Sequence, residues 1–311
     1  MRLDRFVADM LAGYSRSRVQ KWIALGAVLV DGTPSPAKRR LAGHEAIEVR
    51  VLPDDADRAF EPDPVPLSVV YENAAVLVID KPPGLVVHPA SGNWRGTLMN
   101  GLLYHRPGLA ALPRAGIVHR LDKDTSGLMV VAKDEAAMLA LVRALAERRV
   151  ARRYLALAFG ESAQQGLIDA PVGRDPRDRT RMAVTAHAGA RGARTHLRRL
   201  AVGALAQQPV SLLECALETG RTHQIRVHLA HLGLPLVGDP VYGRADPRGE
   251  LRRQALHAWL LAFVDPADGV RHVFSSRPPG DLVAAIEAAG IDFAACWSQL
   301  NADRGRERAA P

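Results

Sequence analysis

Cysteine is almost absent from this chain of 311 residues, which contains only Cys215 and Cys296. The two lie far apart and outside any Cys-x-x-Cys pattern, which argues against a disulfide framework and a cysteine-rich zinc site. We expect both to be buried as small apolar residues. No apolar run approaches the roughly 18 residues that a membrane span requires, and the N-terminus has no apolar signal core. We therefore expect a cytoplasmic protein without a membrane partner.

Nucleotide and metal motifs are also lacking. The chain has no Gly-x-Gly-x-x-Gly and no Walker-type run, which disfavours folds that bind nucleotide cofactors. It has no His-Glu-x-x-His pattern either, and on a helix His223 and His228 would point about 140° apart. His228 and His231 are more typical of core or RNA-facing residues. We expect neither a cofactor nor a metal ion.

Positive charge is in excess, with 41 Lys and Arg against 33 acids and a net charge of +8. A polyanionic partner such as nucleic acid would explain this excess, and a generally Arg-rich proteome would explain it equally well. About half of the excess lies in residues 1–50, which hold nine basic and five acidic side chains. The N-terminal segment is therefore the candidate for a nucleic-acid surface.

A short basic helix is expected within that segment. Ser15 or Ser17 can cap a helix that runs to about Leu25, followed by strands at residues 28–30 and 47–52. Three cations project from the start of this helix: Arg16, Arg18 and Lys21. Cations at a helix start oppose the helix dipole, so stability does not account for them, whereas phosphate binding would.

The N-terminal segment resembles the alpha-L RNA-binding module of a small-subunit ribosomal protein and of many RNA-modifying enzymes. Residues 2–6, 15–20 and 26–32 carry the resemblance, which covers about residues 1–52. The alternative is a helical accessory domain with a solvated basic face. The resemblance implies that Arg16, Arg18 and Lys21 bind RNA.

Composition suggests how the rest of the chain divides. Residues 51–67 contain four prolines and five acids, so we expect a linker at residues 53–67 between the module (1–52) and a catalytic domain at 68–300. Residues 301–311 form a polar tail that we expect to be frayed. The larger domain alternates predicted strands with a few helices, and several strands follow one another directly. This pattern favours an α+β fold with a mixed, largely antiparallel sheet.

A polar turn at residues 119–127 runs straight into an apolar strand at residues 128–132. Polar groups at a strand entrance often line a cleft. Asp122 and Asp124 suggest a calcium-binding loop that begins at Asp122. The twelfth residue of such a loop would be Lys133 instead of the required Glu, and a strand follows where a calcium loop is followed by a helix. Taken alone, the run favours a structural Asx-type turn.

Two further segments carry candidate site residues. In residues 217–233 a strand ends, Thr222 is expected to cap a helix, and Arg226 lies one turn into it, where a guanidinium can clamp a carboxylate. Tyr154 follows two arginines at a predicted strand start, and such a tyrosine is most often a core residue with a satisfied hydroxyl. Neither segment identifies a function by itself.

Taken in order, the segments 81–89, 119–127, 152–157, 217–233 and 253–258 resemble the RluA family of pseudouridine synthases over about residues 2–295. Within that family the chain is most similar to the D-type branch, which acts on large-subunit ribosomal RNA. The supporting stretches are 85–97, 113–116, 170–174 and 179–184. Residues 195–200 depart from the family pattern, where an aromatic in a plainer strand is expected, which puts the exact target in doubt.

The resemblance implies an isomerase that cleaves the bond from ribose to N1 of a flipped uracil and rejoins the base through C5. It implies that Asp122 is the catalytic carboxylate, that Arg226 pairs with it, that Tyr154 stacks on the uracil, and that Arg120 fills the gap left by the flipped nucleotide. It implies ribosomal RNA as partner and no cofactor, and we expect a monomer. The alternatives are the same reaction on transfer RNA or another ribosomal site, a non-catalytic assembly factor, and a metal-dependent phosphodiesterase that uses Asp122, Asp124 and the histidines.

Overall fold

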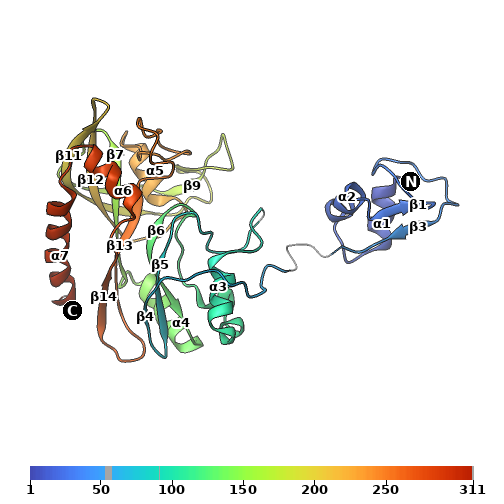
Figure 1. Cartoon of the computed structure of the whole chain (residues 1–311), viewed down its shortest axis with the longest axis horizontal. Helices are drawn as coiled ribbons and strands as arrows, with labels where there is room; N and C mark the ends of the chain where they lie inside the picture. Colours follow the sequence, from blue (N-terminus) through green and yellow to red (C-terminus); the bar gives the residue numbers. More distant parts are fainter. Residues whose placement is uncertain (53–57, 91, 310–311) are drawn as a thin grey trace. The chain divides into compact units, whose positions relative to one another are not determined.

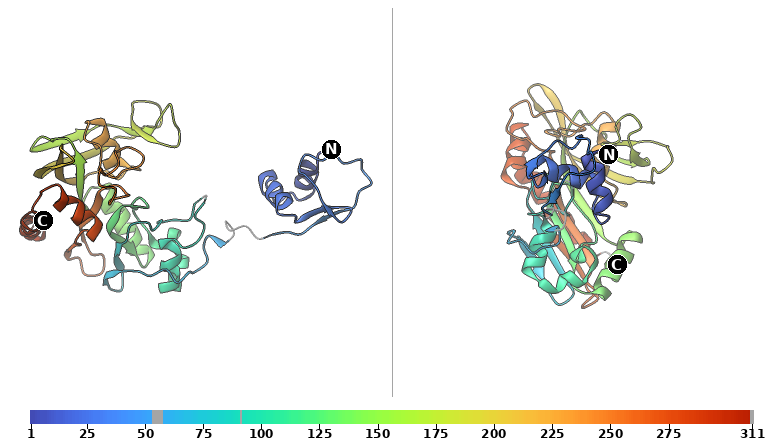
Figure 2. Two further views of the ribbon diagram at one scale, coloured as in Figure 1. Left: turned by 45° about the horizontal axis from the view of Figure 1, so that its top comes forward. Right: turned by 90° about the vertical axis from the view of Figure 1, so that its right-hand side faces the viewer.

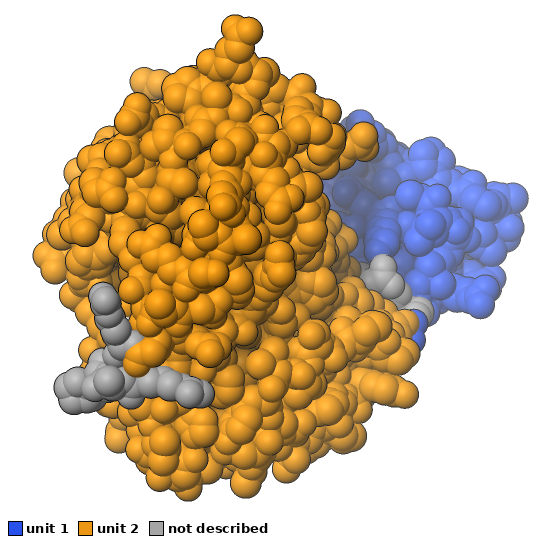
Figure 3. All heavy atoms as spheres, turned by 60° about the vertical axis from the view of Figure 1, so that its left-hand side comes forward, with its two compact units in different colours: residues 1–58 blue, residues 59–311 orange. Residues whose placement is uncertain are grey.

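The computed structural model describes residues 1–52, 58–90 and 92–309. It divides into two compact units, Met1–Arg58 and Ala59–Pro311 (Figure 3). The expected linker at residues 53–67 lies in part, at 53–57, outside the described residues. None of the described helices is both long and apolar enough to cross a membrane.

The first unit packs two helices on a small antiparallel sheet with strand order β2-β1-β3. Its elements are α1 (Leu3–Met10), α2 (Arg16–Ala24), β1 (Val28–Val30), β2 (Thr33–Pro34) and β3 (Ile47–Val49). Ser15 caps α2, as expected, because its hydroxyl accepts a hydrogen bond from the backbone N–H of Arg18 at 3.3 Å. The buried core brings Leu3 and Val7 of α1 against Trp22 of α2.

The second unit is built on a nine-stranded sheet with the order β4-β5-β6-β13-β7-β12-β11-β8, and β14 pairs with β13 (Figure 1). The strands are β4 (Val69–Glu72), β5 (Val76–Lys81), β6 (Ser126–Ala132), β7 (Ala151–Phe159), β8 (Gln165–Asp169), β11 (Arg194–Leu205), β12 (Gln208–Leu217), β13 (Leu256–Val264) and β14 (Arg271–Ser275). Only the β6–β13 pair is parallel among these described strands. The expected mixed, largely antiparallel sheet is therefore confirmed. β9 (Val172–Arg174) and β10 (Met182–Val184) form a separate hairpin.

Side chains alternate across this sheet and so supply a core on each face. Leu77 and Ile79 of β5 pack on one face, where α3 (Leu98–His105) and α5 (Gln224–His231) contribute, and Val76 and Val78 pack on the other, with α4 (Glu135–Ala146). The helices α6 (Gly280–Ala288) and α7 (Phe293–Ala309) complete that second face beside β7, β12 and β13 (Figure 2). Both cysteines are buried, as expected.

Two boundaries differ from the sequence-based expectation. Residues 59–67 pack on α3, where the Asn100 amide donates to the carbonyls of Ala59 and Glu61 at 2.9 and 2.8 Å, so this part of the expected linker is docked. Residues 301–309 of the expected frayed tail instead continue α7, where Asp303 pairs with Arg198 at 2.6 Å, and residues 310–311 lie outside the described residues. In both places polar side chains find partners that composition does not reveal.

Candidate active site

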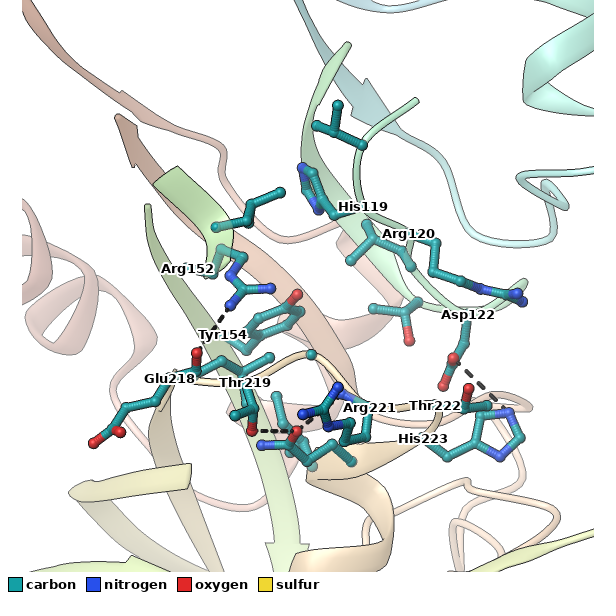
Figure 4. A pocket seen from close by; sticks show the side chains of 18 of the residues that line it. His119, Arg120, Asp122, Arg152, Tyr154, Glu218, Thr219, Arg221, Thr222 and His223 are labelled. Atoms are coloured by element: carbon teal, nitrogen blue, oxygen red, sulfur yellow. Dashed lines mark hydrogen bonds and ion pairs between the residues drawn. The ribbon is translucent and has the colours of Figure 1, made fainter. Parts of the chain in front are cut away.

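A cleft of about 500 Å³ opens on the sheet face that carries α5. The loop before β6, the start of β7, the end of β12 and the turn before α5 line it (Figure 4). Its volume lies in the range of roughly 300–1,000 Å³ that is usual for small-molecule sites, so a single nucleotide can enter it.

The loop that carries Asp122 is fixed by the strand that follows it. Gly127 in β6 has φ +116°, and a Cβ added there would lie 2.3 Å from the carbonyl oxygen of Ala258. Only glycine therefore permits the close parallel contact of β6 with β13. Next to it, the Ser126 hydroxyl and the buried His257 share a hydrogen bond of 2.9 Å. The backbone N–H of Thr125 closes the turn on the carbonyl of Asp122 at 3.1 Å.

Lys81 ties a second loop to this turn. Its ammonium group is 1% exposed and donates to the carbonyls of Pro82, Leu85 and Lys123 at 2.7, 3.0 and 2.8 Å. Burial lowers the pKa of Lys81 to about 7, against the charges of Asp124 and Asp122, which raise it. Three carbonyl acceptors require three N–H donors, so the hydrogen-bond pattern is that of the charged form.

Arg226 connects two carboxylates inside the site. Its Nη1 donates to Asp122 at 3.0 Å, while Nε and Nη2 donate to the two oxygens of Asp239 at 2.7 and 2.8 Å. Burial opposes the charge of Arg226, but Asp239 and Asp122 outweigh it and raise its pKa. Burial likewise opposes ionisation of Asp239, and the Arg226 hydrogen bonds still lower its pKa. This clamp fixes the position of Asp122.

A third group reaches Asp122 from the turn before α5. His223 lies in the left-handed region at φ 57°, and its Nε2 is 3.8 Å from the second carboxylate oxygen of Asp122. Its Nδ1 shares a hydrogen bond of 2.7 Å with the hydroxyl of Tyr242, which also accepts the backbone N–H of Met182 at 2.8 Å. Burial lowers the pKa of His223, although Asp122 acts in the opposite direction.

The expectation that Thr222 caps α5 is wrong. The N-cap residue is His223, and no side chain caps the helix there. Instead the Gln224 side chain organises the turn, accepting from the backbone N–H of Arg221 at 3.0 Å and from the Thr219 hydroxyl at 2.8 Å. Because a left-handed N-cap residue precedes the helix, the first turn begins one residue later than the Thr222 pattern predicts.

Tyr154 lies at the base of the cleft and is 6% exposed. Burial raises its pKa to about 12. Within the described part of the chain no hydrogen bond reaches its hydroxyl, so the alternative of a core tyrosine with a satisfied hydroxyl does not describe it.

The structure brings Arg226 together with Asp122 and Tyr154 in the same cleft. Arg120 lies exposed beside Asp122 (Figure 4). Asp124 is not among the lining residues. The three histidines that suggested zinc have separate surroundings. His223 faces Asp122, His228 is buried against Thr195 and the carbonyl of Ala170, and His231 is exposed.

Sequence reasoning missed several residues around Asp122. These are Lys81, Arg152, His223, Asp239 and Tyr242. One signal could have revealed Asp239, because an acid between Gly238 and Pro240, followed by Gly243, indicates a tight turn that fixes a carboxylate. There the Asp239 carboxylate also accepts the backbone N–H groups of Val241 and Tyr242.

The three expected RNA-binding residues of the first unit, Arg16, Arg18 and Lys21, have different surroundings. Arg16 binds the buried carboxylate of Asp4 at 2.9 Å, so stability does account for this cation, contrary to expectation. Burial opposes the charge of Asp4, but Gln20, Arg2 and Arg16 lower its pKa. Arg18 lies over the rings of Tyr14 and Trp22. Lys21 is exposed.

Comparison with known proteins agrees with this fold. The chain matches the family described as RNA pseudouridylate synthase over residues 75–231 and the S4 domain over residues 1–41. Proteins named ribosomal large subunit pseudouridine synthase D from Nitrosomonas europaea and Xanthomonas campestris are 47% and 48% identical to it, over 93% and 94% of this chain and 84% and 90% of theirs. The solved structure of human RNA pseudouridylate synthase domain containing 1 is 31% identical, with a TM-score of 0.57 over 72% of this chain and 89% of that chain.

The chain belongs to the RNA pseudouridylate synthase family. It is accordingly an isomerase that converts uridine in RNA to pseudouridine, with an S4 domain at its N-terminus. The expected family, fold and reaction class are confirmed.

Proposed function

We propose that this enzyme isomerises uridines of large-subunit ribosomal RNA. The support comes from relatives named for that substrate, which are 43% to 48% identical and align with 94% of the chain. The main structural support is that Arg226 holds Asp122 beside Tyr154, in a cleft large enough for a nucleotide. We further expect the enzyme to be a monomer without a metal and to act in the cytoplasm, where bacterial ribosomal RNA is found.

In the proposed reaction Asp122 acts on the ribose of a flipped uridine, either as nucleophile at the anomeric carbon or as base at the neighbouring carbon. Arg226 holds one carboxylate oxygen of Asp122, which leaves the other, 3.8 Å from His223, to face the cleft. Tyr154 provides a flat surface on which the uracil stacks while it turns. No step needs a redox change.

Two further roles concern RNA binding. Arg120 is exposed beside the cleft and is placed to fill the gap that the flipped nucleotide leaves, which offsets part of the few kcal/mol of unstacking. The S4 domain adds a second RNA contact on the same chain and so raises affinity through effective concentration. Arg16, Arg18 and Lys21 are its candidate phosphate ligands, and Arg16 also binds Asp4.

Tritium release from RNA labelled at C5 of uridine tests the reaction. The wild-type enzyme is expected to release tritium, and release is expected to be unaffected by EDTA. No release by the folded wild-type protein would refute the isomerase assignment, and cleavage of the RNA chain that EDTA abolishes would favour the phosphodiesterase alternative.

Chemical mapping of pseudouridines, in cells with and without the gene, tests the substrate. Large-subunit ribosomal RNA is expected to lose specific modifications when the gene is removed, while transfer RNA keeps its own. Loss confined to transfer RNA would retain the reaction but overturn the proposed target. Light scattering of the purified protein tests the expected monomer.

A further inference from the structure

Arg152 is a buried cation that has no anionic partner among the described residues. It is 8% exposed and lines the cleft. Within the described part of the chain its Nε has no hydrogen-bond partner, and Nη2 makes a single contact of 3.4 Å with the carbonyl of Glu218. No described carboxylate forms an ion pair with Arg152. The carboxylate of the neighbouring Glu218 pairs instead with Arg148, Arg194 and His196. An uncompensated buried charge is costly unless it serves a ligand.

The local backbone holds this guanidinium in place. Arg152 and Tyr154 lie two residues apart on β7, so their side chains leave the same face of the sheet. Gly220 makes room on the other side, since a Cβ there would lie 2.7 Å from Nη1 of Arg152. The nearby His119 accepts the backbone N–H of Val130 at 3.1 Å, and burial together with the Arg152 charge lowers its pKa to about 3. His119 is therefore neutral, and Arg152 is the positive charge at this place in the cleft.

Charges of opposite sign lie on the two sides of Tyr154. Figure 4 shows Arg152 on one side of its ring and Asp122 on the other. Asp122 is the group that acts on the ribose, and the base of a flipped nucleotide lies deeper in the cleft than the phosphates. Arg152 is almost fully buried beside Tyr154, the proposed stacking partner of the uracil. It therefore faces the base of the bound nucleotide and not its phosphates.

We propose that Arg152 is a catalytic residue that binds the carbonyl oxygens of uracil and stabilises the uracil anion formed when the glycosidic bond breaks. This inference rests on the proposed function of the site. When the bond between N1 and C1′ cleaves, its electron pair leaves with the base, and the negative charge spreads over N1, O2 and O4. The ribose carbon is then bonded to Asp122, or has lost its neighbouring proton to Asp122.

The later steps return the charge. C5 attacks the ribose carbon with a ring electron pair, and Asp122 leaves or gives its proton back. The proton on C5 is then lost and N1 gains a proton, so the product is an isomer of the substrate. Arg152 is needed while the base carries the negative charge. Fixed cations aimed at developing charge act mainly on the rate of such a step, not on substrate binding.

The test compares Arg152→Met, Arg152→Lys and wild type in single-turnover tritium release, with filter binding and thermal unfolding of each full-length protein. Arg152→Met is expected to slow release about 100- to 1,000-fold, the usual effect of removing one such donor, while the Kd for RNA changes little. Arg152→Lys is expected to recover part of the rate. Arg152→Met is also expected to raise the melting temperature, because it removes an unpaired buried charge.

RNA that contains 5-fluorouridine sharpens this test. Fluorine stabilises the uracil anion by induction, so consumption of this substrate is expected to depend less on Arg152 than consumption of uridine does. Arg153→Gln is the matched control, since Arg153 lies next in β7 on the opposite face, beside Glu214, and is expected to keep the wild-type rate.

Each other outcome overturns the inference. A weaker Kd with a salt slope reduced by about 1 would make Arg152 a phosphate ligand. A lower melting temperature for Arg152→Met with a proportionate loss of rate and binding would make it structural. Full activity of Arg152→Met alongside active wild type would refute this inference alone, whereas inactive wild type would refute the proposed function.

Discussion

Asp239 binds Arg226 through both carboxylate oxygens and leaves only Nη1 of the guanidinium for Asp122. The side chain of Asp239 is fully buried and that of Arg226 is 5% exposed. A planar guanidinium held at two nitrogens has little rotational freedom, so the position of Asp122 depends on a residue that does not itself reach the reacting ribose.

Asp239→Asn is expected to lower both stability and activity. An amide offers one acceptor oxygen and no charge, which leaves Arg226 buried with half of its compensation. Removing one partner of a buried pair costs about 3–5 kcal/mol, and we expect the single-turnover rate to fall because Asp122 loses its fixed position. Urea unfolding and tritium release measure the two effects.

The control for Asp239→Asn is the same substitution at an exposed ion pair. Asp169 pairs with Arg194 at 2.8 Å, and its side chain is 51% exposed. Asp169→Asn is expected to cost about 0–1 kcal/mol and to leave the rate unchanged. Equal effects of the two substitutions on stability and rate would mean that the Asp239–Arg226 pair contributes no more than an exposed ion pair.

The pKa of Asp239 also predicts a pH dependence. Burial raises this pKa, but Arg226 lowers it further, so the net shift is downward. A carboxyl whose pKa is lower in the folded state stabilises the fold above its unfolded pKa, and this stabilisation is lost as the pH falls. Below about pH 5, wild type should therefore lose stability more steeply than Asp239→Asn. Melting temperatures between neutral and acid pH measure the difference, and parallel curves would contradict it.

Asp122→Asn and Asp124→Asn separate the two acids of the polar turn at residues 119–127. Asp122→Asn should fold, because Arg226 keeps both bonds to Asp239, and it should bind RNA while losing at least about 100-fold in rate, the lower limit usual for a proton-transfer group. Asp124 does not line the cleft, so Asp124→Asn is expected to stay active. Single-turnover assays distinguish them, and retained activity of Asp122→Asn would rule out its role.

Lys81→Met is expected to disrupt the polar turn at residues 119–127. Lys81 itself is not expected to contact the substrate. The substitution leaves the carbonyls of Pro82, Leu85 and Lys123 without their donor in a buried place. Each unsatisfied group costs about 1–3 kcal/mol, so a large loss of stability is expected, together with a lower rate. Thermal unfolding and tritium release measure both. An unchanged melting temperature would mean that the turn is held by its own backbone.

Local patterns predicted a turn before β6, a strand at Tyr154 and a helix at Arg226, but the roles of these residues came only from the family resemblance. The pairing of Arg226 with Asp239 could not be predicted, since the two meet only once α5 and the turn after it are folded. Arg16 shows the same limit. Its place at a helix start suggested phosphate binding, but Asp4, twelve residues earlier in the chain, lies close enough in space to bind it.

Local rules also fail where tertiary contacts compete with them. Composition predicts an extended linker up to residue 67, but the Asn100 amide holds residues 59 and 61 against α3. Thr222 has the residue type of a helix cap, but the Gln224 side chain already organises that turn. Polarity alone does not reveal which polar side chains are already paired.

The S4 domain offers a last prediction, in which two basic residues on one helix should behave differently. Lys21 is exposed, and Lys21→Ala is expected to weaken RNA binding and reduce the salt slope by about 1. Arg16→Ala should instead destabilise the domain, because it removes one of the partners of the buried Asp4. Filter binding at several salt concentrations and thermal unfolding separate these effects, with Lys38→Ala, an exposed residue of the same charge, as the control. If Lys21→Ala and Lys38→Ala weaken binding equally, net charge alone accounts for the contribution of Lys21, and a specific phosphate contact at Lys21, in the last turn of α2, is refuted.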